Sequence, residues 1–383
     1  MSQKSALDDN AFRGECTAAD HMREKRNGKP QAEKRAFFLW GGLLCISVLF
    51  HLAARLIPGF AEWYAVYVYP VFVGTLGRLC SLLPFSVIEI LLYVGIALIL
   101  AGVIGVVMRR LALKRALGIL ARTLIAVFLV FTLNCGINYQ RLPFSERAGF
   151  VLQESTEKEL IALCERLVEE INAAAEDIAL DEDGHCILEG DLTELAREAM
   201  AAAALEYPEL EGYYPRAKPV LSTWYLSSQL LQGVYSPFTV EANYNNGMPD
   251  QDKPSTVCHE LSHLKGFMRE DEANFVAYLA CRASENAGFR YSGSILAYIY
   301  SGNALYAHNP AALRKVREKL CDQAVRDLLD HNAYWDTYRG AISEVSDKVN
   351  DMYLKANAQE AGTKSYGRMV DLLLAWNREQ DKT

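Results

Sequence analysis

The chain has 383 residues, of which 51% are hydrophobic and 22% are charged, and its formal net charge is −8. This composition excludes a disordered chain, and the acidic balance argues against a nucleic-acid partner, which would require a basic surface. The apolar residues are concentrated before about residue 140. We therefore expect a membrane domain followed by a soluble domain.

Three apolar stretches predict membrane-spanning helices. They follow a polar tail, residues 1–36, and lie at about 37–56, 87–107 and 119–139. Each stretch is long enough to cross a hydrocarbon core of about 30 Å. The first one starts too far from the N-terminus for a cleaved signal peptide, so we interpret it as an uncleaved signal anchor.

A further apolar segment, near residues 63–84, has two interpretations. Its first part, 63–77, is short, contains Pro70 and is rich in Tyr and Trp, which is typical of an interfacial or re-entrant segment. A full crossing would place the basic residues 109–115 outside the cell, against the usual charge distribution. We favour three spans within a membrane domain of residues 37–140, with a fourth crossing as the alternative.

Basic residues predict the orientation of this membrane domain. They gather in the tail and between the second and third spans, where Arg109, Arg110, Lys114 and Arg115 lie. Because cytoplasmic loops collect Lys and Arg, we expect the tail and this loop to face the cytoplasm. Three spans then place residues 141–383 on the outer side of the membrane.

The pattern after residue 141 predicts a soluble domain that is mainly α-helical. Apolar residues recur at helical spacing over 155–180, over about 191–206 and again from about 254 onward. Between these helices, residues 220–249 are rich in aromatic and β-branched residues with turn formers, which predicts two or three short strands. The expected fold is therefore mainly α, with a small sheet directly before the helix that starts near 254.

That helix carries the motif HELSH at residues 259–263. Residues four apart lie on the same face of a helix, so His259 and His263 can both reach one zinc ion. Glu260 follows the first histidine and is placed to accept a proton from a water molecule that a metal activates. The alternative is a helix with two solvent-facing histidines, but Val257 and other apolar residues give the helix a side to bury.

A catalytic zinc also needs a third protein ligand and an open fourth position. The pattern ExxAN at residues 270–274 resembles the second helix of glutamate-type zincins, in which the Glu binds zinc and the residue four positions later supports a ligand histidine. This resemblance implies that Glu270 is the third ligand and that Asn274 supports one of the two ligand histidines. Glu272 remains the alternative ligand, and helical phase favours Glu270.

Two further side chains are candidates for stabilising an oxyanion. Tyr366 and His308 carry hydrogen-bond donors of the kind that enzymes direct at developing negative charge. A helix start near Tyr366 and a capped helix end near His308 explain the same residues equally well. Both therefore enter as catalytic candidates with a structural alternative.

Several stretches together resemble one family. CGINYQR at 135–141, GVYSPFTVEAN at 233–243, HELSHLKGF at 259–267 and residues 349–374 are similar to the bacterial membrane family called domain of unknown function 3810. The resemblance implies a membrane-tethered, zincin-like metallopeptidase and names no substrate. The motif residues point to the same metal, because imidazole and carboxylate groups are common zinc ligands.

The expected function is therefore a Zn²⁺-dependent peptidase anchored in a bacterial plasma membrane. Its N-terminus would face the cytoplasm, and it would act on peptide or protein at the outer surface of the lipid bilayer. The alternative is a non-catalytic metal-binding sensor or scaffold of the cell envelope. An intact Glu260 argues against this alternative, whereas a fourth protein ligand at the metal would favour it.

Overall fold

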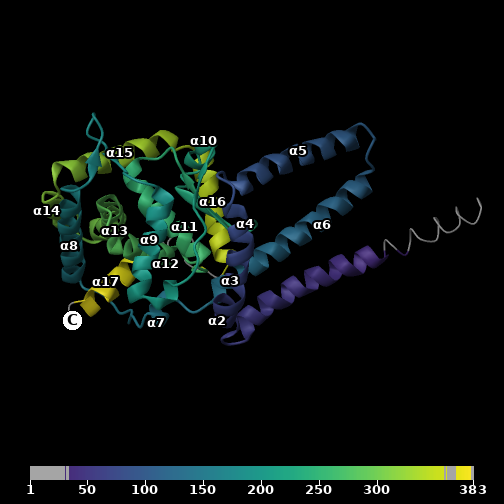
Figure 1. Cartoon of the computed structure of the whole chain (residues 1–383), viewed down its shortest axis with the longest axis horizontal. Helices are drawn as coiled ribbons and strands as arrows, with labels where there is room; N and C mark the ends of the chain where they lie inside the picture. Colours follow the sequence, from purple (N-terminus) through teal and green to yellow (C-terminus); the bar gives the residue numbers. More distant parts are fainter. Residues whose placement is uncertain (1–30, 32–33, 358, 360–367, 381–383) are drawn as a thin grey trace, which may run out of the picture.

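Long apolar helices extend from one side of a mainly helical body (Figure 1). The computed structural model describes residues 31, 34–357, 359 and 368–380. We call the described residues from 141 onward the body. The prediction of a mainly helical chain with small sheets and apolar helices near the N-terminus is confirmed.

Among the described residues, three helices are long and apolar enough to cross a membrane. They are Lys34–Leu56, Val87–Val107 (α5) and Leu113–Gln140. We call Leu113–Gln140 the third apolar helix. It comprises α6 (Leu113–Phe131), the π turn η3 (Thr132–Gly136) and the 3₁₀ turn η4 (Asn138–Gln140).

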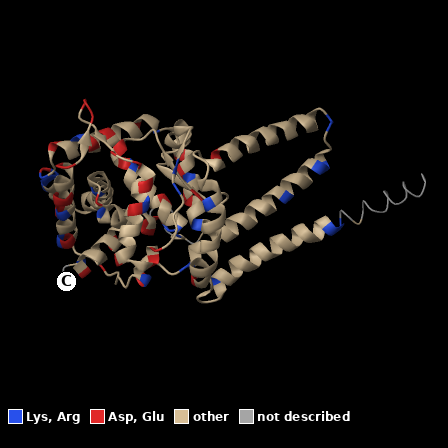
Figure 2. Ribbon diagram, viewed as in Figure 1, with Lys and Arg blue, Asp and Glu red and all other residues tan. Residues whose placement is uncertain are grey.

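Two of these helices begin earlier than the sequence predicted. The first already includes Lys34, so the end of the expected tail 1–36 is helical, and the third begins at Leu113 rather than at 119. The third helix thus includes Lys114 and Arg115, because long basic side chains lie along a helix while their charges stay in water. Figure 2 shows Lys and Arg at the helix ends remote from the body.

Residues 60–81 form a helical segment that runs across the direction of the apolar helices (Figure 1), and we call it the crosswise helix. Tyr64, Tyr69 and Val73 on it are buried, whereas Tyr67 is 69% exposed. Its π turns hold an extra residue each, which keeps the buried positions on one side at spacings of four and five. Its parts are α2 (Phe60–Trp63), η1 (Tyr64–Val68), α3 (Tyr69–Phe72), η2 (Val73–Gly77) and α4 (Arg78–Ser81).

The body is built from helices around a buried core. Its α-helices are α7 (Phe144–Arg147), α8 (Glu157–Ala175), α9 (Leu192–Glu206), α10 (Thr223–Ser227), α11 (Lys253–Leu264), α12 (Glu270–Ala283), α13 (Ala287–His308), α14 (Pro310–Arg317), α15 (Asp322–Tyr338), α16 (Ala341–Ala356) and α17 (Met369–Gln380). Its 3₁₀ turns are η5 (Pro208–Leu210) and η6 (Asp250–Asp252).

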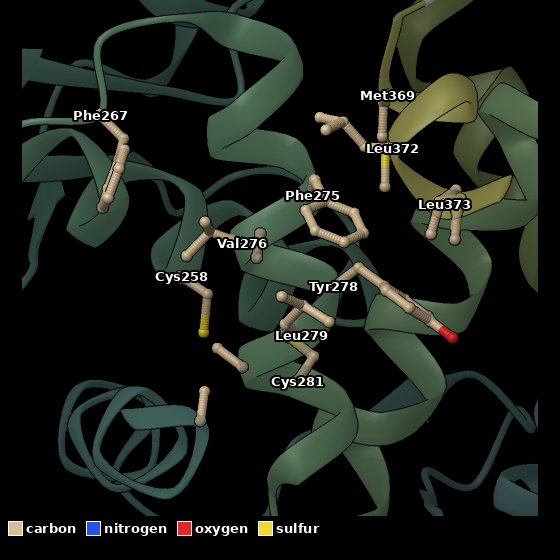
Figure 3. Close-up of a cluster of buried hydrophobic side chains, with 14 of the residues drawn as sticks. Cys258, Phe267, Phe275, Val276, Tyr278, Leu279, Cys281, Met369, Leu372 and Leu373 are labelled. Carbon is tan, nitrogen blue, oxygen red and sulfur yellow. The ribbon is translucent and has the colours of Figure 1, made fainter. Parts of the chain in front are cut away.

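The two helices that carry the motif residues lie deep in this core. Figure 3 shows side chains of α12, among them Phe275 and Tyr278, between α11 and α17. Cys258 of α11 and Leu373 of α17 contribute from either side, and all four residues are fully buried. Close packing of this kind fixes the backbone of α11 and α12, because core side chains interdigitate with few voids.

Two small sheets complete the body. The first is a hairpin of β1 (Ala179–Leu180) and β2 (Cys186–Ile187). The second has the order β3-β5-β4, with β3 (Lys218–Val220) parallel to β5 (Glu241–Asn245) and β4 (Gly233–Ser236) antiparallel to it. The predicted small sheet before the motif helix is therefore confirmed, and β4 is one of its edge strands.

Carboxylates fasten this sheet to the start of α5. Glu241 on β5 accepts hydrogen bonds from the backbone N–H groups of Val87 (3.2 Å) and Ile88 (3.0 Å). In return Glu89 of α5 accepts the N–H groups of Leu221 and Ser222, both at 2.8 Å. The first N–H groups of a helix have no partner within it, so these contacts satisfy them and hold the body against the apolar helices.

Candidate metal centre

A short reversal of the chain brings the end of α11 and the start of α12 together. His259 and His263 lie one turn apart on α11, and Glu270 is the first residue of α12. Gly266, between the helices, has φ 94°, a left-handed conformation that glycine adopts without strain. A Cβ there would lie 3.1 Å from Arg141 Nη1, so a side chain would also displace this guanidinium slightly.

The three expected ligands converge on one point. His259 Nε2 lies 3.2 Å and His263 Nε2 lies 3.8 Å from the same oxygen, Oε2 of Glu270. One ligand atom from each residue lies within 4.8 Å of the others. Two imidazole nitrogens and a carboxylate form a donor set of zinc hydrolases, so these residues fit a zinc ion by chemistry and by proximity.

Hydrogen bonds set the orientation of both imidazole rings. His259 Nδ1 lies 2.8 Å from Asn274 Oδ1, and His263 Nδ1 lies 2.8 Å from the backbone oxygen of Phe267. Amide and carbonyl oxygens only accept, so each Nδ1 carries a proton, and Nε2 is the nitrogen whose lone pair would bind a metal once any proton on it has left. The structure thus brings Asn274 to His259, one of the expected ligands, and Asn274 Nδ2 lies 3.3 Å from Tyr300 Oη.

Glu272, the alternative ligand, lies in a different environment. Its Oε1 accepts the backbone N–H of Phe144 at 3.0 Å and lies 3.1 Å from Arg269 Nη1. The ligand group contains Glu270 and not Glu272. Geometry therefore favours Glu270, because the Glu272 carboxylate is already held by a guanidinium and an amide.

The close approach of these groups shifts their pKa values. Burial alone would lower the pKa of His263, but the hydrogen bond to Glu270 and its charge raise this pKa to about 9. Burial would raise the pKa of Glu270, yet the two histidines hold it well below its usual value. The carboxylate is thus stabilised in its charged form, as a metal ligand must be.

Glu260 is buried next to the ligands. Its side chain is 4% exposed, and Oε2 has no hydrogen-bond partner among the described residues. Burial is the main cause that raises its pKa to about 7. A Cβ on Gly233 of β4 would lie 2.5 Å from Glu260 Oε1, so the first residue of β4 leaves the space that this carboxylate occupies.

A cavity of about 740 Å³ opens beside the three ligands and Glu260. Its walls come from β4, from α13, from α16 and from the end of the third apolar helix, which contributes Cys135 and Tyr139. Tyr300 and Tyr353, which each carry a hydroxyl group, also line the cavity. The site is therefore a concave pocket of the size that binding sites for small molecules or peptide segments have.

The two oxyanion candidates from the sequence do not gain support. His308 is exposed at the end of α13 and does not line the cavity. It lies eight residues beyond Tyr300, about 12 Å along the helix, so the structure does not bring it to the cavity, and its role stays an untested prediction. Tyr366 lies outside the described residues.

Sequence reasoning missed the residues that complete the cavity. The residues missed are Tyr300 on α13, Tyr353 on α16 and Gly233 on β4. They lie outside the HELSH motif and belong to no motif of their own. For Gly233 the one available signal was its residue type, because a glycine in a strand often marks a place where another group approaches the backbone closely.

The family model described as "Protein of unknown function (DUF3810)" matches residues 64–374. No curated protein and no solved structure matches the chain. The family match extends from the crosswise helix to α17 and includes all three expected ligands as well as Glu260. Because it covers more than half of the sequence, the chain belongs to the DUF3810 family.

Proposed function

We propose that the protein is a membrane-anchored, Zn²⁺-dependent peptidase. His259, His263 and Glu270 would hold the metal, and Glu260 would act as the general base. The observation that carries the proposal is the convergence of the three ligand atoms within 4.8 Å, beside a buried carboxylate and an open cavity. Zinc in such a donor set supplies Lewis-acid activation of water and of a substrate carbonyl.

Glu260 is suited to move the proton that peptide hydrolysis requires. Its buried carboxylate would accept a proton from the attacking water and deliver it to the departing amine nitrogen. The backbone of Gly233 confines the carboxylate on one side, because a Cβ at Gly233 would lie only 2.5 Å from Glu260 Oε1. A confined base keeps its proton-accepting oxygen at one place in the cavity.

The edge strand β4 supports a peptide as the substrate class. Its residues Gly233, Val234 and Tyr235 line the cavity, and β4 is at the edge of the sheet order β3-β5-β4. An edge strand can bind an extended peptide through backbone hydrogen bonds. A peptide aligned in this way would pass beside Glu260 and the three ligands.

Tyr300 replaces the earlier candidates as the donor to the oxyanion. Its hydroxyl group lies 3.3 Å from Asn274 Nδ2, and Asn274 in turn contacts His259. Because the amide nitrogen donates to the phenol oxygen, the Tyr300 O–H is available to donate into the cavity. A phenol at that place would stabilise negative charge on a tetrahedral carbonyl oxygen.

The arrangement of charge supports a body on the outer side of a plasma membrane. Lys and Arg gather at the helix ends remote from the body (Figure 2). Arg109 and Arg110 lie between α5 and α6, and Lys114 lies in the first turn of α6. Since these residues favour the cytoplasmic side, the N-terminus would be cytoplasmic and the substrates would be peptides or proteins at the outer surface. A cysteine-accessibility assay on intact cells, with probes at loop 109–112 and in β1–β2, tests this orientation.

The alternative of a non-catalytic sensor or scaffold is less well supported. Among the described residues the ligand group has three members, His259, His263 and Glu270. Structural zinc sites are usually closed by four protein ligands, whereas catalytic sites leave one position open. The sensor hypothesis therefore needs a fourth ligand that this group lacks.

Peptide cleavage by the full chain tests the proposal. We compare wild type with Glu260→Gln in lipid nanodiscs, using a mixed library of fluorogenic peptides, and measure bound zinc in the same samples. We expect equal zinc content and a loss of cleavage of about 10²- to 10⁴-fold, since Gln cannot accept a proton. Cleavage by Glu260→Gln at the wild-type rate would overturn the assignment of the base.

A further inference from the structure

Helix α16 exposes a stripe of apolar side chains. Ile342, Val345, Val349 and Met352 are 52%, 60%, 55% and 62% exposed, respectively. Their spacing of three and four residues places them on one side of the helix, and we call them the α16 stripe. A contiguous apolar surface on a protein usually marks a place where a partner binds.

The other sides of α16 have different characters. Glu344, Lys348 and Lys355 are exposed charges, which form a separate face at helical spacing. Ser346 and Asp347 instead line the metal cavity. The helix therefore has a charged side, a side that forms a wall of the cavity, and the apolar stripe.

The C-terminal end of α16 is attached where the apolar helices meet the body. The ring of Tyr353 lies edge-on to Phe131, the last residue of α6, with ring centroids 6.2 Å apart. Arg55, one residue before the end of the first apolar helix, donates from Nη2 to the backbone oxygen of Ala356 at 3.3 Å. The helix thus touches two of the three candidate membrane spans.

The length of the third apolar helix indicates where this contact lies relative to the bilayer. Phe131 lies 18 residues beyond Leu113, which is about 27 Å along the helix. A hydrocarbon core is about 30 Å thick, so a helix that enters near Leu113 reaches the opposite boundary close to Phe131. Tyr353, which contacts Phe131, is then at the surface of the bilayer.

A second exposed apolar surface lies next to α5 and is connected to α16 through α15. Leu221 and Trp224 are 68% and 63% exposed, and Ser222 between them bonds through Oγ to Tyr93 Oη of α5 at 2.5 Å. The adjacent α10 is linked to α15, whose end precedes α16, by a hydrogen bond between Ser227 Oγ and Tyr334 Oη of 2.6 Å. Exposed apolar side chains near α10 therefore border α5, and α15 connects α10 to the start of α16.

We propose that α16 is an interfacial helix whose stripe lies in the boundary between lipid headgroups and acyl chains. Lipid is the occupant because α16 contacts two candidate membrane spans through Tyr353 and Ala356, at the level where the third apolar helix would leave the bilayer. Amphipathic helices of this kind bury their apolar side about 5–10 Å into that boundary. One wall of the metal cavity then rests on lipid, and this inference does not depend on the chemistry of the metal centre.

Site-specific fluorescent probes test this placement on the full chain. Single cysteines at Val345 and Val349 are compared with matched exposed positions Glu344 and Lys348 on the charged side, in a background with Cys16, Cys45 and Cys321 replaced by Ser. Each carries an environment-sensitive NBD group in nanodiscs of phosphatidylcholine and phosphatidylglycerol. Some of the lipids bear a spin label near the headgroup or deep in the acyl chain.

We expect the emission at Val345 and Val349 to shift to shorter wavelength and to lose intensity with the shallow spin label more than with the deep one. The emission at Glu344 and Lys348 should remain that of a probe in water. Water-like emission at all four positions would overturn the proposal. A blue shift at Val349 without quenching by either lipid would also overturn it, because protein and not lipid would then cover the stripe.

Hydrogen exchange provides an independent readout. In nanodiscs, Val345→Glu with Val349→Glu should make the amides of α16 exchange faster, because charged side chains leave the lipid and release the helix. Glu344→Gln with Lys348→Gln changes the same number of exposed positions and should leave exchange unchanged. Equal exchange in the two double variants would contradict a lipid contact through the stripe.

Discussion

Replacement of Gly233 by Ala should disable Glu260 while leaving the metal ligands in place. A Cβ at this position would lie 2.5 Å from Glu260 Oε1, 2.8 Å from its Cγ and 2.9 Å from the backbone oxygen of Asn243. Contacts between carbon and other heavy atoms are normally about 3.5 Å or longer, so the carboxylate must move by about 1 Å. The strand cannot yield easily, because Gly233 pairs with Tyr244 of β5.

A displacement of this size should reduce peptide cleavage strongly. Misplacement of a catalytic group by 1 Å lowers a rate by about 10²-fold. The Gly233→Ala protein should therefore cleave about a hundred times more slowly than wild type and still bind zinc. Overpacking should also lower the free energy of unfolding by about 1–3 kcal/mol, which thermal unfolding in nanodiscs measures.

Gly340→Ala is the matched control, since a Cβ there has no heavy atom within 4 Å. It should leave cleavage, zinc content and melting temperature close to those of wild type. Wild-type cleavage by Gly233→Ala would refute the idea that Glu260 must occupy its present place to act as the base. Loss of zinc together with activity would refute it as well, because the change would then act on the ligands.

Four further predictions concern the ligands and the fold. Glu270→Gln should abolish tight zinc binding in a competition titration, whereas Glu272→Gln should leave it unchanged, because only the first carboxylate faces the histidines. Asn274→Ala should weaken zinc binding by about 10- to 100-fold, since the ring of its histidine partner loses its orientation. Lys218→Met should lower the free energy of unfolding by about 3–5 kcal/mol, because it leaves the Glu241 carboxylate buried without its cation. Chelation of the metal should lower the melting temperature of wild type, because a ligand that binds only the folded state stabilises it. The decrease should be larger for samples that contained more free zinc before chelation.

The parts of the site that depend on local periodicity could be predicted from the sequence. His259 and His263 share a face because a helix repeats every 3.6 residues, whatever surrounds it. Glu270 was one of two candidates, and the structure favours it because Glu272 contacts Arg269 and the backbone of Phe144. The sequence could not exclude Glu272, since the partners that hold it come from outside α12.

The parts that depend on contacts between distant segments could not be predicted. Tyr300 and Gly233 reach the cavity through the packing of α13 and β4, for which the sequence contains no short-range signal. His308 was a candidate in the sequence analysis and Tyr300 was not, yet Tyr300 lines the cavity and His308 lies about 12 Å further along the same helix. Placement along a helix thus decides which of its side chains line the cavity beside the expected ligands.

The apolar helices show the same division. Their existence follows from the length of each apolar run, and α5 occupies the predicted residues 87–107. The start of the third helix did not follow, because Lys114 and Arg115 were interpreted as loop residues although helical backbone accommodates them. The role of its end as a wall of the metal cavity depends on Cys135 and Tyr139, which meet α16 only in the folded chain.

The central claim is that His259, His263 and Glu270 bind one zinc ion. It is tested most directly by elemental analysis of the full chain, purified in nanodiscs without chelators, for wild type and for His263→Ala. We expect about one zinc per wild-type chain and a loss of most of it in the variant. A wild-type protein that takes up no metal even when zinc is supplied, or a His263→Ala protein with the same zinc content as wild type, would contradict the claim.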